Sequence, residues 1–257
     1  EIYTLSLHDA LPISFKYMWE NLPFSNRIFN KFADEFYGWK FAWSLKPGDV
    51  VFLTNFGNVF FKVVKRKGVK VVHEKTEHPD VYSFKGFNVE RYKREVVKVD
   101  GMFVISTALK DYFVSCGLPK EKIEIVNMTV DSNRFVGLTK QPSEKYIAYC
   151  GTASNNKDGV DELIKSFAIV NKTHPEVKLY IIGKTPDKND ASGNLKLIEN
   201  LGVKDSIVFT GIVSAADIPQ ILKNAAVLAL DRPDSLQAQC GFPTKLGEYL
   251  LTENPVI

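Results

Sequence analysis

The sequence contains little cysteine, no long apolar run and no large excess of charge of either sign. Its three cysteines, Cys116, Cys150 and Cys240, are an odd number, lie far apart and form no CxxC pair. Neither a disulfide framework nor a zinc site is therefore indicated, and a reducing, cytoplasmic setting is expected. No run of about 18 apolar residues, the length that spans a bilayer, occurs in the sequence.

The composition is that of a globular protein with no strong preference for nucleic acid. The net charge is +3, which is too small to indicate a nucleic-acid partner but suits an anionic ligand. Hydrophobic residues make up 45% of the chain and charged residues 25%. A chain of 257 residues can form one large domain or two ordinary ones.

The two ends of the sequence do not look like native termini. Residues 1–14, EIYTLSLHDALPIS, have no positive amino-terminal region and no clean apolar core, so they are not a signal peptide. They resemble a translated sequencing adapter, and we treat them as a non-native leader. We also expect Ile257 to end the chain inside a strand, so that the domains at both ends are incomplete.

Short apolar segments alternate with helical patterns along the rest of the chain. Strands are expected at residues 49–53, 70–72, 102–105, 123–126, 146–149, 177–182, 207–209 and 227–230. This rhythm favours parallel sheets with right-handed crossovers. The predicted fold class is α/β, with two Rossmann-like domains over residues 15–138 and 139–257.

Several helices have recognisable ends or faces. Residues 15–46 are expected to form one or two helices with a buried aromatic face, and residues 89–96 a basic amphipathic helix. Ser106 is a predicted helix cap. Asp158 is expected to cap the helix that follows it, and Ser214 with Asp217 resembles a capping box.

Two loops that follow predicted strands carry polar or small residues. The first, residues 73–79, contains His73 and Glu77 and is expected to be a polar surface loop; a metal site is disfavoured because no tetrahedral ligand set is evident. The second, residues 150–159, could wrap a phosphate with its backbone amides or only connect a strand to a helix. It has neither GxGxxG nor GxxxxGK[ST] spacing.

The segment from residue 231 to 257 comes closest to chemistry. Pro243 is placed to be a first helical residue, so the free amides of Thr244 and Lys245, the helix dipole and the Lys245 ammonium would form an anion site. Glu248 lies one turn further on and suits a hydroxyl-rich group such as a ribose. The plainer alternative is a solvated lysine paired with Glu248 at i, i+3.

The run Gly-Phe-Pro-Thr-Lys-Leu-Gly-Glu-Tyr-Leu, followed by Asn-Pro-Val-Ile, resembles the donor-binding segment of the retaining GT-B glycosyltransferases of family 4. In that family two acidic residues separated by seven others grip the nucleotide sugar. Glu248 matches the second acid, and Cys240 stands where the first is usual. The family also has a Gly-Arg pair after the strand that corresponds to residues 146–149, and a lysine before the helix that follows this strand. Thr152 stands at the arginine, and Lys157 matches the lysine.

The resemblance implies transfer of a sugar, with retention, from a nucleotide-sugar donor to a hydroxyl acceptor in polysaccharide or glycoconjugate synthesis. The catalytic residues that it implies are His73, Lys157 and Glu248. Its donor-binding set is Gly151, Thr152, Lys157, Arg232, Ser235, Gly241, Phe242, Thr244, Lys245 and Glu248. Arg232 and Ser235 would contact the donor sugar, and His73 and Glu77 would face the acceptor.

No metal or cofactor is expected beyond the nucleotide sugar. The acceptor would be a glycan or a lipid-linked molecule, so the full-length protein could make a peripheral contact with the inner membrane face. Cys240 and Thr152 leave open a non-catalytic nucleotide-sugar-binding module, and a GT-B-like nucleotide-sugar epimerase is a third alternative. The 257-residue chain is expected to be inactive in transfer by itself.

Overall fold

The computed structural model describes residues 36, 38–54, 58–85, 87–153, 155–184 and 192–257. The side chains of Asn58, Ser83, Phe84, Lys85, Asn156 and Lys157 also lie outside the described part. The described residues belong to two compact units. The first unit runs to His73 and includes Lys98–Asp100, and the second comprises Glu74–Val97 and Gly101–Ile257. The predicted leader, 1–14, lies outside the described residues.

The first unit contains a parallel strand pair joined by a helix. β1 (Val50–Leu53) pairs with β2 (Lys70–Lys75), with Leu53 opposite His73. α3 (Asn58–Val63) connects them and buries Phe60 and Val63. The predicted strand-helix-strand order is confirmed, and β2 continues three residues beyond its expected end at residue 72.

The expected buried aromatic face is wrong for the described part of residues 15–46. Residues 38–44 are helical, but the side chains of Trp39 and Trp43 are 53% and 64% exposed. Their rings stack on each other with centroids 4.8 Å apart. The buried residues of this helix are Gly38 and Ala42, so its small residues pack inward and the two indoles stack on each other at the surface.

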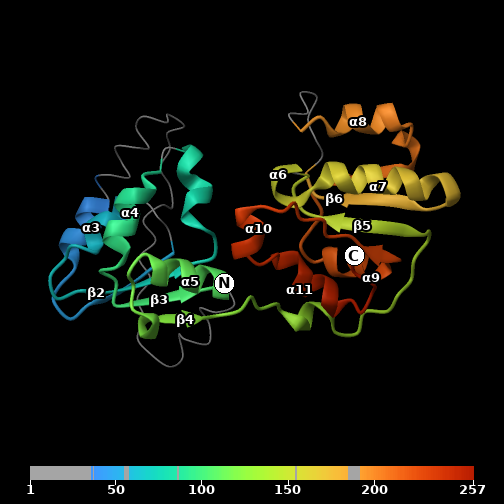
Figure 1. Ribbon diagram of the computed structural model, residues 1–257. Coiled ribbons are helices and arrows are strands. Elements are labelled where there is room, and N and C mark those ends of the chain that lie inside the picture. The colour runs from blue at the N-terminus through green and yellow to red at the C-terminus, as the bar shows by residue number, and fades with distance from the viewer. Residues whose placement is uncertain (1–35, 37, 55–57, 86, 154, 185–191) are drawn as a thin grey trace. The chain divides into compact units, whose positions relative to one another are not determined.

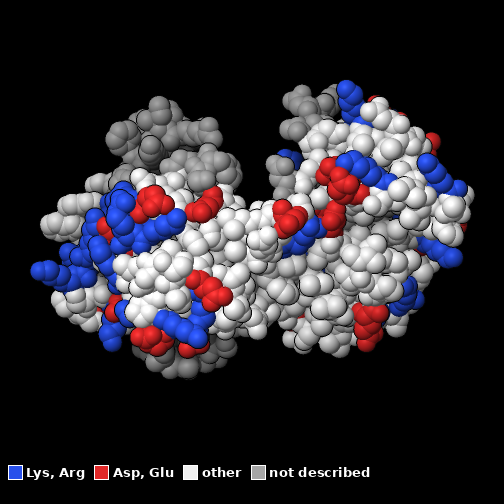
Figure 2. Space-filling view, in the orientation of Figure 1, with Lys and Arg blue, Asp and Glu red and all other residues white. Residues whose placement is uncertain are grey.

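The amino-terminal part of the second unit confirms two predicted helices. α4 (Val89–Val96) buries Tyr92 and Val96, while Arg91 and Arg94 are exposed, and Lys and Arg side chains gather around this helix in Figure 2. It is therefore the basic amphipathic helix that the sequence indicates.

Ser106 caps the next helix as predicted. Its hydroxyl accepts a hydrogen bond from the Leu109 amide at the start of α5 (Thr107–Ser115). β3 (Gly101–Val104) and β4 (Ile123–Ile125) flank this helix in sequence and pair in parallel. The short 3₁₀ helices of this part are η1 (Pro79–Lys85), η2 (Lys120–Lys122) and η3 (Ser132–Phe135).

The carboxyl-terminal part of the second unit is a four-stranded sheet whose paired strands are all parallel. Its strands are β5 (Tyr146–Cys150), β6 (Lys178–Ile182), β7 (Ile207–Gly211) and β8 (Val227–Leu228), in the order β7-β6-β5-β8. The chain steps outward from β5 to β7 and then crosses back to place β8 on the other side of β5. The strand order thus reverses between β5 and β8, the kind of place where open parallel sheets bind ligands.

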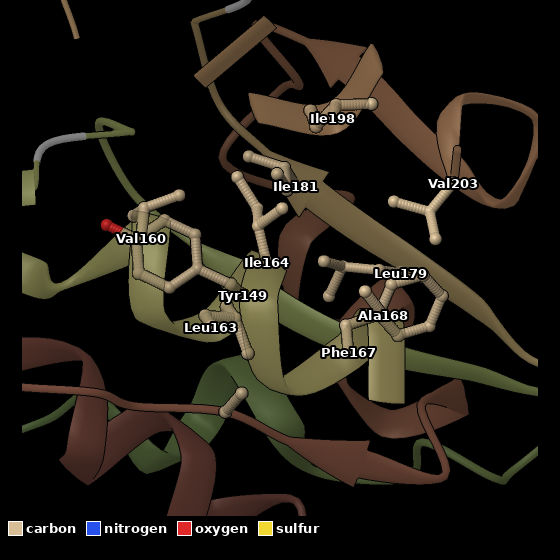
Figure 3. Packing of buried hydrophobic residues seen from close by; sticks show 11 residues of the cluster. Tyr149, Val160, Leu163, Ile164, Phe167, Ala168, Leu179, Ile181, Ile198 and Val203 are labelled. Carbon is tan, nitrogen blue, oxygen red and sulfur yellow. The ribbon is translucent and has the colours of Figure 1, made fainter. Parts of the chain in front are cut away.

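Helices cover both faces of this sheet (Figure 1). α7 (Val160–Thr173) and α8 (Asn194–Leu201) lie on one side, and α9 (Ile218–Asn224) and α11 (Thr244–Leu251) on the other. Alternate residues of β5 and β6 point to opposite faces of the sheet. Tyr149 and Ile181 lie on the face that α7 covers, as Figure 3 shows. A strand buried on both faces must be apolar throughout, which is why these segments could be predicted as continuous apolar runs.

Two predicted helix caps are wrong. The residue before α7 is Gly159, in the left-handed conformation with φ 56° and without a side-chain cap, and Asp158 instead ends the short helix α6 (Asn155–Asp158). α9 starts at Ile218, and the Ser214 hydroxyl accepts from the nearby Ala216 amide instead of forming a capping box. The short helix η4 (Lys204–Ser206) precedes β7, and α10 (Leu236–Cys240), which the sequence did not indicate, follows β8.

The fold is α/β with parallel strand pairing, as predicted. Within the described ranges, every helix is too short or too polar to cross a membrane.

Candidate functional site

A cavity of about 530 Å³ lies in the second unit, beside the segments that follow β5 and β8. The residues that follow β5 contribute Gly151, Thr152 and Asp158. The segment after β8 contributes Arg232, Gln237, Gly241, Phe242, Pro243, Thr244 and Lys245, and Thr76, Glu77 and Met128 complete the lining. The cavity therefore occupies the point where the strand order reverses, and seven of the ten predicted donor-binding residues line it.

Lys245 is held in place by charge, hydrogen bonding and an aromatic ring. Its ammonium lies 3.0 Å from Asp158 Oδ1, donates to the Tyr149 hydroxyl at 3.1 Å and sits 4.4 Å from the centre of the Tyr149 ring. Tyr149 in turn donates to Asp158 Oδ2 at 2.9 Å. These contacts hold a positive charge at the cavity wall before any ligand binds.

The environment of Tyr149 opposes ionisation of its phenol. Burial, and then the neighbouring Asp158 carboxylate, raise the pKa of the Tyr149 phenol well above its ordinary value. This network explains why the predicted cap at Asp158 is wrong. The Asp158 side chain is buried and binds Lys245 and Tyr149, so it does not cap α7. The i, i+3 pair between Lys245 and Glu248 is not formed, since Lys245 binds Asp158.

Gly151 makes room for the lysine. Its φ is 154°, and a Cβ at this position would lie 2.8 Å from Lys245 Nζ and 2.9 Å from the Tyr149 hydroxyl. The loop after β6 passes close to Gly151, because a Cβ on Gly183 would overlap the Gly151 carbonyl oxygen. Glycine at position 151 therefore leaves room for the Lys245 ammonium, and glycine at position 183 lets the loop after β6 approach the loop after β5.

The start of α11 borders the cavity. Pro243 is the residue before the helix, not its first residue as predicted, and its carbonyl accepts from the Leu246 amide at 3.0 Å. Thr244 and Lys245 form the first turn, whose amides lack acceptors within the helix itself. Tyr249 fixes the helix to the sheet, since its buried hydroxyl accepts from the Cys150 amide at 2.8 Å. The positive end of α11 is thereby anchored at the cavity.

Glu248 is paired with an arginine that the sequence did not indicate. Arg134 in η3 donates to Glu248 Oε1 through Nη1 and to the Ala215 carbonyl at 2.8 Å through Nη2. Both side chains are partly buried, and Glu248 is not among the residues that line the cavity. No local pattern marks residue 134, because its partner lies 114 positions further along the chain.

Of the two predicted acceptor-side residues, Glu77 lines the cavity. Its Oε1 accepts from Gln237 Nε2 at 3.0 Å and its Oε2 accepts from the Tyr82 hydroxyl. Burial, and then this bond to Glu77, raise the pKa of Tyr82 to about 12. Glu77 is therefore held by two donors at the cavity wall.

His73 is fully buried in β2 of the first unit. Its Nδ1 lies 2.8 Å from the Leu53 carbonyl oxygen, and its ring stacks on Phe60. The expectation of a polar surface loop over residues 73–79 is wrong, because β2 runs to Lys75, and Lys75 and His78 are buried as well.

The remaining predicted site residues have mainly local roles or lie outside the described part. The Ser235 hydroxyl caps α10 by accepting from the Ala238 amide. Cys240 is buried, burial raises the pKa of its thiol, and its carbonyl accepts from Ser106 Oγ at 2.5 Å. The backbone of Lys157 belongs to α6, and its side chain lies outside the described residues. Within the described ranges, no group of three or more His, Cys, Asp or Glu side chains could hold a metal ion.

Comparison with known proteins finds similarity to glycosyltransferases, mainly in the carboxyl-terminal part of the chain. Residues 144–257 match the family model described as Glycosyl transferases group 1. Mannosylfructose-phosphate synthase of Agrobacterium fabrum (strain C58 / ATCC 33970) is 26% identical over 141 residues, which cover 49% of this chain and 30% of that protein.

Solved structures of GT-B glycosyltransferases share the fold. Anabaena Alr3699/HepE in complex with UDP is 17% identical with a TM-score of 0.63, over 81% of this chain and 58% of that one. The lipopolysaccharide outer core galactosyltransferase WaaB in its apo form is 17% identical with a TM-score of 0.60, over 91% and 63% of the two chains. This chain spans less than two thirds of the length of each of these relatives.

Proposed function

We propose that this chain is part of a glycosyltransferase that transfers a sugar, with retention, from a nucleotide-sugar donor to a hydroxyl acceptor in polysaccharide or glycoconjugate synthesis. The observation that carries the proposal is the cavity at the strand-order reversal of the group 1 domain, where Lys245 and the start of α11 meet. A cavity with this lining suits a phosphate ester.

The chemical task is to stabilise the diphosphate as its bond to the sugar carbon loosens. Donors and cations that are already in position do this without reorganising at the moment of reaction. Lys245 meets that requirement, because Asp158 and Tyr149 hold its ammonium at the cavity wall. The amides of Thr244 and Lys245 would add the positive end of α11, and Lys157 is the predicted second lysine.

Glu248 would hold the ribose hydroxyls of the donor, and Arg134 would orient it. The ion pair fixes one carboxylate oxygen and leaves the other able to accept from a hydroxyl group. On the acceptor side, Glu77 lines the cavity and His73 remains a prediction. Side-chain cations would do the electrostatic work, so no divalent metal or cofactor is proposed.

Similar proteins support the proposed class of donor. The Anabaena structures hold UDP and UDP-glucose, which favours a nucleotide sugar as the donor here. A glycan or lipid-linked acceptor is proposed, with a cytoplasmic location and peripheral contact of the full-length protein with the inner membrane face.

The proposal is tested by combining calorimetry with turnover. The chain is titrated with UDP, GDP and ADP and with UDP-, GDP- and ADP-sugars, and the full-length protein is assayed for nucleotide release with and without glycan acceptors. Binding with acceptor-dependent release and a retained anomeric configuration is the expected result. Binding without turnover identifies a binding module, and an epimerised sugar released without acceptor identifies an epimerase. Absence of binding to every nucleotide overturns the proposal.

A further inference from the structure

The charged side chains that line the cavity are not all matched. Lys245 is paired with Asp158, and Glu77 accepts hydrogen bonds from Tyr82 and Gln237. Arg232 is the exception, because within the described ranges its guanidinium forms no ion pair with a carboxylate. Arg232 therefore brings to the cavity wall a guanidinium that no described carboxylate binds directly.

The guanidinium of Arg232 is also short of hydrogen-bond acceptors. Its Nη2 donates to the Gln237 carbonyl at 3.2 Å, whereas its Nε is buried and finds no acceptor among the described residues. A buried donor without an acceptor is costly, and an acceptor supplied to this guanidinium by a ligand or a water molecule would reduce that cost.

Gly241 places the guanidinium next to the segment that leads into α11. A Cβ on Gly241 would lie 3.9 Å from Arg232 Nη2. It would lie only 2.8 Å from the Gln237 carbonyl oxygen, which accepts the hydrogen bond from Arg232. Arg232 and the first turn of α11 are thus brought to the same wall of the cavity. A multiply charged anion at this wall would meet both of them.

We propose that the Arg232 guanidinium binds the diphosphate of the nucleotide donor, and not the donor sugar as the sequence suggested. This inference rests on the proposed function. A planar guanidinium offers parallel N–H groups that match two phosphate oxygens, and its permanent charge compensates a diphosphate better than a sugar hydroxyl. Arg232 then adds a cationic contact to the leaving group beside that of Lys245, whose ammonium Asp158 holds in place.

The test compares ligands that differ only in phosphate. Among UDP, GDP and ADP, the diphosphate that binds most tightly is used with the nucleoside of the same base, and both are titrated into the chain by calorimetry. We expect Arg232→Ala to weaken binding of the diphosphate by about 10- to 100-fold and to leave the nucleoside within about 2-fold. Arg232→Lys, which keeps the charge but not the paired N–H groups, is expected to lie between the two.

A compensating substitution separates a lost contact from a damaged fold. Thr152 is exposed and lines the same cavity, so Thr152→Arg in the Arg232→Ala background returns a guanidinium to the site. Partial recovery of diphosphate affinity is expected. Arg94→Ala, at an exposed position on α4, is the matched control and should bind like the unmodified chain. Thermal unfolding of each variant checks the fold.

Three outcomes would overturn the role of Arg232 and leave the proposed function standing. They are unchanged diphosphate affinity in Arg232→Ala, an equal loss of affinity for the nucleoside, and a loss seen only with the nucleotide sugar. If Arg232→Ala is unfolded, Arg232→Lys and Arg232→Gln decide, and equal affinity in these two overturns a role for charge. If the unmodified chain binds no nucleotide, the proposed function fails and this inference fails with it.

Discussion

Tyr149 organises the charged side chains of the cavity at the level of single residues. It contacts Lys245 through both its hydroxyl and its ring, and the same hydroxyl donates to Asp158. The strand β5 determines this arrangement, because alternate residues point to opposite faces and the loop turns directly after Cys150. A lysine that would otherwise be solvated becomes a fixed part of the wall.

Removing one partner of this ion pair should cost more than removing both. Lys245→Met leaves the Asp158 carboxylate buried without its cation and is expected to lower the free energy of unfolding by about 2–4 kcal/mol. The double variant Lys245→Met with Asp158→Asn should recover most of that loss, since Tyr149 can still donate to the amide oxygen. Urea unfolding of the two single variants and the double variant measures the coupling. Additive losses would show that the pair contributes little.

Glu248 and Arg134 make a second residue-level prediction. Glu248→Ala should abolish measurable nucleotide binding, because it removes the group assigned to the ribose. Arg134→Met should weaken binding by about 3- to 10-fold, the loss expected when one hydrogen-bonding contact that positions Glu248 is removed and Glu248 itself stays. Calorimetry with a ribonucleotide and its 2′-deoxy analogue separates the two roles. Nucleotide affinity that is unchanged in Glu248→Ala would contradict the assignment.

At the level of elements, strands were predicted better than the ends of helices. β5 and β6 could be located because continuous apolar runs report burial on both faces, and that burial is confirmed. The caps assigned to Asp158 and Ser214 were wrong, because an isolated pattern cannot show that Asp158 binds Lys245, 87 positions away by their numbering. α10 was missed because five residues carry too little periodicity to be recognised.

Strand β2 shows how tertiary burial changes the chemistry of a single element. Lys75 ends the strand at only 4% exposure, and burial lowers its pKa from 10.5 to about 7, although Glu77 and Glu74 act in the opposite direction. Between these two pKa values the unfolded chain binds more protons than the folded one. The free energy of unfolding should therefore rise with pH above about 7 and level off near 10.5.

This dependence can be isolated with one substitution. Between pH 7 and pH 9, Lys75 should contribute a rise of about 2 kcal/mol in the free energy of unfolding. Lys75→Met keeps a side chain of similar length without a titratable group. The free energy of unfolding of this variant should therefore rise less between the two pH values, by the amount that Lys75 contributes. Urea unfolding of both proteins at the two pH values gives the difference. Identical slopes would show that Lys75 keeps an ordinary pKa in the folded chain.

At the level of the whole molecule, the proposed chemistry depends on protein cations and not on a metal ion. Arg232, Lys245 and the start of α11 supply the positive charge at the cavity. We therefore expect EDTA to change nucleotide affinity by less than about 2-fold, whereas a rise in ionic strength from about 0.05 M to about 0.5 M should weaken it several-fold through screening. Uridine or another free nucleoside is the control, since its uncharged contacts are not screened. A loss of about 10-fold or more in EDTA would contradict metal-independent binding.

The sequence by itself determined the order of the strands, the α/β class and most of the segments that border the cavity. These properties depend on local periodicity and on the rule that parallel sheets bind ligands beside the carboxyl ends of their strands. Only the tertiary structure decided how the charges are matched: Asp158 with Lys245, Arg134 with Glu248, and Arg232 with no described carboxylate. Electrostatic pairing acts between residues that folding brings together from distant positions, so no local pattern in the chain could reveal it.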